Sequence, residues 1–75
     1  MTPELLTACG EALYGARWQS DLSRDLLVND RTIRRWCAGD SPVPTGVDID
    51  LLRLMIERAD DIGELIHKLR REGSL

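Results

Sequence analysis

Several residue types are scarce in this chain, and each scarcity excludes a class of protein. Two cysteines and one histidine occur among 75 residues, too few for a disulfide framework or a tetrahedral zinc site with its usual spacing. We interpret Cys9 and Cys37 as small apolar side chains in or near the core. No apolar run approaches the about 20 residues that cross a bilayer, and no basic patch precedes an apolar stretch at the start. We therefore expect a cytoplasmic protein with no metal, no cofactor and no membrane contact.

The residue combinations that catalysis requires are also missing. His67 has no nucleophile or second ligand at a suitable spacing, and no Gly-rich phosphate loop is present. The acidic pairs Asp48/Asp50 and Asp60/Asp61 are better explained by helix capping and solvation. We therefore expect a protein that is not an enzyme.

The composition is that of a folded protein: 43% of residues are hydrophobic and 31% are charged. No alternating pattern typical of a strand occurs, which favours an all-α domain spanning residues 1–75. A domain of this size buries little surface. Its core must be economical or be completed by a partner.

The net charge of −3 is unevenly distributed. Residues 1–16 carry −2, residues 17–39 carry five arginines against three aspartates, and residues 40–75 carry five basic against eight acidic side chains. The positive charge is thus concentrated in the middle of the chain, where a nucleic acid would bind.

Capping signals predict three helices in the first half. Thr2 precedes Pro3 at a helix start, and Gly15 is suited to end that helix near Tyr14. Apolar spacing predicts a second helix from Trp18 to just before Val28. Asn29 caps a third helix over residues 30–38, which Gly39 ends.

Prolines and glycines in residues 39–46 predict a loop. Apolar stripes then favour helices over about residues 47–72, one before and one after Asp60 and Asp61. One bent helix is the alternative, since Gly63 weakens a helix by only about 1 kcal/mol. We expect two helices, and hence five in all.

The segment from Trp18 to Gly39 resembles the helix-turn-helix of lambda-repressor-like, Cro-type DNA-binding regulators. The matching positions are Gln19, Leu22, Ser23, Leu26, Val28, Asn29, Thr32, Ile33 and Trp36. The sequence departs from the family pattern at Leu27, where a turn glycine is common, and at Ser23, where alanine is typical. The resemblance implies a five-helix lambda-repressor-like domain with a motif at about residues 18–39.

The resemblance also implies which residues contact DNA. Ile33 and Trp36 must point inward, so the base-reading face would carry Asp30, Arg31, Arg34 and Arg35, with Arg34 at its flank. Arginine is the usual partner of guanine. Asp30 would accept from cytosine, or would serve only the helix dipole and pair with Arg34. Phosphate contacts are expected from Arg17, Gln19, Asn29 and Thr32.

The last apolar stripe predicts an interface between two copies. Ile62, Leu65, Ile66 and Leu69 share one helix face, and a small core does not cover all of them. Two copies would present two recognition helices about 34 Å apart. The alternative is that the stripe completes the core of the single chain.

Together these patterns favour a homodimeric transcriptional regulator, more readily a repressor than an activator, that binds an inverted-repeat operator in double-stranded DNA. The alternative is an antitoxin or inhibitor that uses the same scaffold to bind a protein partner.

Overall fold

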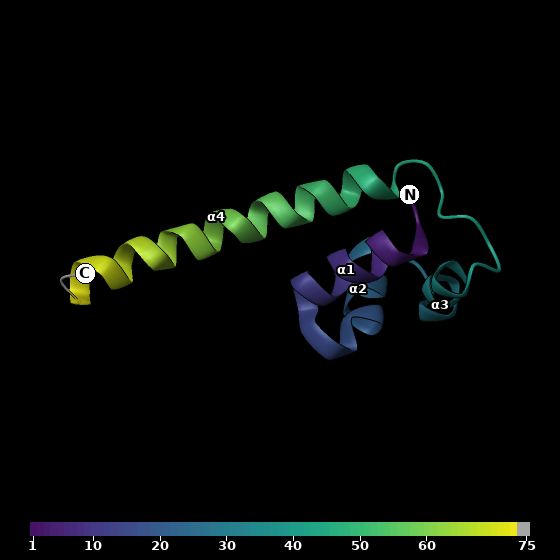
Figure 1. Ribbon diagram of the computed structural model, residues 1–75, viewed down its shortest axis with the longest axis horizontal. Coiled ribbons are helices and arrows are strands. Elements are labelled where there is room, and N and C mark those ends of the chain that lie inside the picture. The colour runs from purple at the N-terminus through teal and green to yellow at the C-terminus, as the bar shows by residue number, and fades with distance from the viewer. Residues whose placement is uncertain (74–75) are drawn as a thin grey trace.

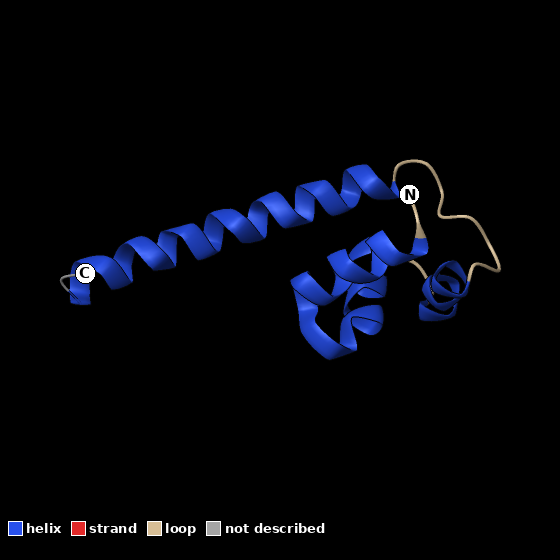
Figure 2. Ribbon diagram, viewed as in Figure 1, coloured by secondary structure: helices blue, strands red, loops and turns tan. Residues whose placement is uncertain are grey.

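The protein consists of a small helical bundle and one long helix that extends beyond it (Figure 1). The computed structural model describes residues 1–73. Its elements are α1 (Pro3–Tyr14), the 3-10 turn η1 (Gly15–Arg17), α2 (Trp18–Leu26), α3 (Asp30–Ala38) and α4 (Val47–Gly73). Figure 2 shows only helices and connecting loops in this part of the chain, which confirms the all-helical prediction.

The molecule is elongated, because α4 outruns the bundle. The principal extents are 50 × 22 × 21 Å and the radius of gyration is 14.9 Å, whereas a compact chain of this length has about 11 Å. α4 packs along α1 near its own start and then continues past the bundle.

Local capping sets the starts of α1 and α3 and the end of α3. The Thr2 hydroxyl accepts from the Leu5 amide at 3.1 Å, and the Asn29 side chain accepts from the Arg31 amide at 2.8 Å. Gly39 ends α3 at a φ of 78°, a left-handed conformation that glycine adopts without steric cost. The predicted bounds of α1 and α3 are confirmed, whereas α2 ends at Leu26 and excludes Leu27, which was expected on its apolar face and is instead left-handed and 90% exposed.

The core is small and lies between α1, α2, α3 and the start of α4. Leu6, Leu22 and Ile33 are fully buried, and each comes from a different helix. Both tryptophans are 5% exposed, so the prediction that Trp36 points inward is confirmed and Trp18 packs in the core as well. The cluster is Leu6, Leu13, Trp18, Leu22, Ile33, Trp36, Val47 and Leu51.

The predicted break between a fourth and a fifth helix is wrong, because α4 runs without interruption from Val47 to Gly73. Asp60 and Asp61 lie inside the helix and cap nothing. A break would leave amides and carbonyls without helical partners on both sides, whereas Gly63 within a helix costs only about 1 kcal/mol. The five-helix count is therefore not found.

Contacts around Tyr14 hold α4 on the bundle. The Arg58 guanidinium donates to the Leu13 carbonyl at 2.6 Å and lies 5.8 Å from the centre of the Tyr14 ring. Two turns earlier in α4, the side chain of Leu51 is only 2% exposed and packs in the core. These contacts fix the first half of α4 against the end of α1.

Candidate nucleic-acid interface

The turn between α2 and α3 contains a left-handed residue other than glycine. Leu27 has φ 57° and ψ 41°, and its side chain is 90% exposed. The Val28 amide donates to the Ser23 carbonyl at 3.0 Å across this turn. Leucine in place of the turn glycine at position 27 thus does not prevent the turn from closing. It does leave an apolar side chain in solvent.

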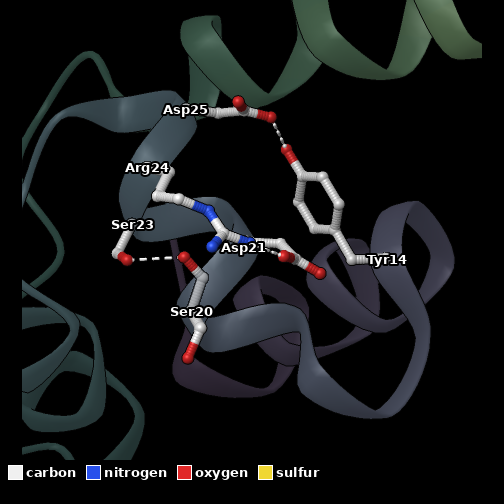
Figure 3. Close-up of polar contacts among 6 residues, drawn as sticks. All are labelled: Tyr14, Ser20, Asp21, Ser23, Arg24 and Asp25. Atoms are coloured by element: carbon white, nitrogen blue, oxygen red, sulfur yellow. Dashed lines mark hydrogen bonds and ion pairs between the residues drawn. The ribbon is translucent and has the colours of Figure 1, made fainter.

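Small and aliphatic side chains lie where α2 and α3 meet. Ser23 is buried, and its hydroxyl donates to the Ser20 carbonyl at 2.6 Å (Figure 3). Alanine is typical at this position in the family that the segment resembles. Serine is accommodated here because this hydrogen bond satisfies its buried hydroxyl. Ile33 and Trp36 anchor α3 from the other side, so α3 has a defined inner and outer face.

The outer face of α3 carries the three arginines predicted to read bases. Arg31, Arg34 and Arg35 are all exposed. Arg34 Nη2 lies 3.7 Å from Asp30 Oδ1. Pairing with Arg34 is one of the two roles expected of Asp30. Within α3 these charges give a net +2 on one short helix.

The four residues predicted to contact phosphates lie in different environments. Arg17 is exposed at the end of η1, and Thr32 is half-buried on α3. The Gln19 amide is turned inward and donates to Cys37 Sγ at 3.7 Å. The Asn29 oxygen is engaged in the cap of α3. Of the four, Arg17 and Asn29 are exposed, and Arg17 is the one that carries a positive charge.

The aspartates of α2 are paired within the bundle. Asp21 forms an ion pair with Arg24, and Asp25 accepts a hydrogen bond from the Tyr14 hydroxyl (Figure 3). Burial, followed by the hydrogen bond to Asp25 and its charge, raises the pKa of Tyr14 to about 12. The ion pair with Arg24 reduces the repulsion that Asp21 would exert on a phosphate backbone, whereas Asp25 keeps its charge.

The residues predicted to form a dimer interface lie on the part of α4 beyond the bundle. Ile62, Leu65, Ile66 and Leu69 are between 44% and 67% exposed. The alternative that they complete the core of the single chain is therefore wrong. The sequence interpretation missed Leu52 and Ile56, which extend the same exposed stripe toward the bundle. The signal for them was the spacing of four residues from Leu52 to Ile56 and of three from Ile56 to Ala59.

Within residues 1–73, no group of three or more histidine, cysteine, aspartate or glutamate side chains is arranged to hold a metal ion. In the same residues, no helix combines the length and apolarity needed to span a membrane. Comparison with protein-family models, curated proteins and solved structures returned no match.

Proposed function

We propose that this protein is a sequence-specific double-stranded DNA-binding regulator of transcription that places α3 in the major groove. The observation that carries the proposal is the exposed arginine face of α3, held on a helix pair whose inner face is buried. Ile33 and Trp36 fix the rotation of α3, so Arg31 and Arg35 point away from the core together.

The dimensions of α3 suit this role. A helix with its side chains is about 10–12 Å across, and the major groove of B-DNA is about 12 Å wide. α3 spans Asp30–Ala38. An arginine reaching a guanine edge makes two hydrogen bonds, and each such pair discriminates by about 1–3 kcal/mol.

Arg34 and Asp30 have a supporting role in this arrangement. Their side chains are 58% and 42% exposed, so the pair is solvated and easily broken. In the free protein it orients Arg34 along α3. On DNA, Asp30 accepts from a cytosine amino group while Arg34 turns to the backbone at the flank.

The charge distribution supports one orientation on the duplex. Residues 17–39 carry a net +2, whereas residues 40–75 carry a net −3. Acidic side chains near phosphates are unfavourable, so α4 lies away from the DNA. Arg17 and the amides at the start of α2 then grip a phosphate beside the groove.

The regulator that we propose is a lambda-repressor-like homodimer. It acts in the cytoplasm as a repressor and binds an inverted-repeat operator. It acts by binding rather than by catalysis, because the arginine face is a solvent-exposed helix surface with no nucleophile beside a base. A single α3 reads only a few base pairs, and two copies supply the specificity of an operator.

The test is selection of duplexes from a random-sequence library, followed by titration at two salt concentrations with random competitor. Arg31→Ala and Arg35→Ala should each weaken binding to the selected site by about 5- to 150-fold, from the range of about 1–3 kcal/mol per arginine–guanine pair. Arg53→Ala is the matched control, because Arg53 pairs with Asp50 on α4 at 3.6 Å.

Binding to the selected site that random competitor does not displace and that each α3 variant weakens would support the proposal. Equal binding to every duplex, or none, would contradict it. A tight complex with another protein that survives both α3 substitutions would instead identify an antitoxin or inhibitor.

A further inference from the structure

The protruding half of α4 is a helix without a partner. Every residue from Ile56 to Gly73 is exposed, and the C-terminal part of α4 runs past the bundle (Figure 1). Isolated helices of about 12–15 residues are marginal in water, and this one contains Gly63. Its apolar side chains need cover from outside the single chain.

The apolar positions of α4 follow a heptad repeat. Spacings of three and four alternate without a fault through Leu52, Met55, Ala59, Ile62, Ile66 and Leu69. This is the seam that packs one helix against another in a coiled coil. The bundle covers only part of this seam: Met55 is half-buried against the core. The seam residues that remain between 44% and 67% exposed are Leu52, Ile62, Ile66 and Leu69.

We infer that α4 pairs in antiparallel orientation with α4 of a second copy of this chain. In one register all six seam positions meet apolar partners: Leu52 packs on the partner's Leu69, Met55 on the partner's Ile66 and Ala59 on the partner's Ile62, each contact occurring twice. A shift by one heptad in either direction leaves several of these side chains without an apolar partner. The two-fold axis then passes between Asp60 and Asp61, which point outward.

Charge complementarity selects the antiparallel orientation. Residues 47–57 carry a net −2, from Asp48, Asp50 and Glu57 against Arg53. Residues 64–73, which lie opposite them, carry a net +1, from Lys68, Arg70 and Arg71 against Glu64 and Glu72. A parallel pair would place the acidic segments side by side.

The pairing deepens the proposed function by naming the partner, which is a second copy of this chain. Only the role of the pair on DNA rests on the proposed function. Antiparallel α4 helices place the two bundles toward opposite ends of the pair. Leu51 of one copy lies about 30 Å along the axis from its counterpart, at about 1.5 Å per residue. That separation is close to the about 34 Å between successive major grooves.

The first experiment measures the mass of the full chain in solution by sedimentation equilibrium. A mass of twice the chain is expected, and Ile62→Glu with Ile66→Glu should reduce it to a single chain. His67→Glu is the control for one added carboxylate, because position 67 lies on the outer side of α4, and it should remain dimeric. A wild-type chain that is monomeric would overturn the inference. The apolar stripe of α4 would then be available to another protein.

The second experiment determines the orientation. With Cys9 and Cys37 replaced by alanine, Leu52→Cys and Leu69→Cys proteins are oxidised alone and as a mixture. Antiparallel pairing should give disulfide-linked dimers only in the mixture, because two copies of position 52 would lie about 25 Å apart along the axis. Disulfides formed by each protein alone would show a parallel pair and overturn the inference.

The two proposals fail separately. If Ile62→Glu with Ile66→Glu leaves a monomer that still selects one half-site, the α4 pairing and the DNA-binding function both stand. If the dimer forms and no duplex is selected, the α4 pairing stands and the proposed function fails.

Discussion

The six-membered ring of Trp18 occupies the space that a side chain at position 10 would need. A Cβ built on Gly10 would lie 2.0 Å from Trp18 Cε3 and 2.3 Å from Cδ2. The absence of a side chain at Gly10 therefore lets the buried ring of Trp18 lie against the backbone of α1, and no other residue type fits there without moving Trp18.

Gly10→Ala should destabilise the protein, although alanine is the better helix former. The gain in helix propensity is about 1 kcal/mol, whereas overpacking a core costs about 1–3 kcal/mol. Because the Trp18 ring is rigid and close, the cost of overpacking at position 10 is at the upper end of that range. Urea denaturation followed by tryptophan fluorescence measures the change. Gly63→Ala is the control, since no atom lies within 4 Å of a Cβ there, and it should stabilise the chain. A stabilised Gly10→Ala protein would contradict the packing.

Leu27→Gly should stabilise the protein by about 1 kcal/mol. Leu27 adopts the left-handed conformation at φ 57°, which costs a residue with a Cβ about 1–2 kcal/mol. Its side chain is 90% exposed, so little packing is lost. Thermal denaturation measures the effect. Ala8→Gly, at an exposed position within α1, should instead destabilise by about 0.5–1 kcal/mol. Equal destabilisation by both substitutions would show that Leu27 is not strained.

The single tyrosine allows its ionisation to be followed directly. Tyr14 should titrate near pH 12 in the folded protein, against about 10 in denaturant, as measured by tyrosinate absorbance. Between these values the folded state holds a proton that the unfolded state has lost. Stability is therefore full below pH 10 and falls as the pH rises toward 12. Asp25→Asn should lower the pKa of Tyr14 only partway, because burial is the larger cause. A folded-state pKa of 10 would contradict the contact.

Arg58→Ala should loosen α4 from the bundle. The substitution removes the hydrogen bond to the Leu13 carbonyl and the contact with the Tyr14 ring, which together are worth about 1 kcal/mol at a solvated site. Hydrogen exchange of amides in the first half of α4 should accelerate accordingly. Arg53→Ala should change it little, because its pairing with Asp50 is exposed and weak. Unchanged exchange in the Arg58 variant would show that apolar contacts alone seat α4.

The sequence alone determined the features that depend on neighbouring residues. Thr2, Asn29 and Gly39 set helix ends through hydrogen bonds and backbone freedom within one turn, so their effects are readable from spacing. The inward direction of Ile33 and Trp36 follows from helical periodicity, and so does the outward direction of the arginines of α3.

Only the tertiary structure decided which residues meet across helices and which parts of α4 the bundle reaches. Leu51 and Leu52 have equal hydrophobicity, yet one is buried and the other is exposed because the bundle lies on one side of α4. The close approach of Gly10 to Trp18 depends on how α1 crosses α2. The continuity of α4 through Asp60 and Gly63 reflects a balance of about 1 kcal/mol, too small for a sequence pattern to resolve.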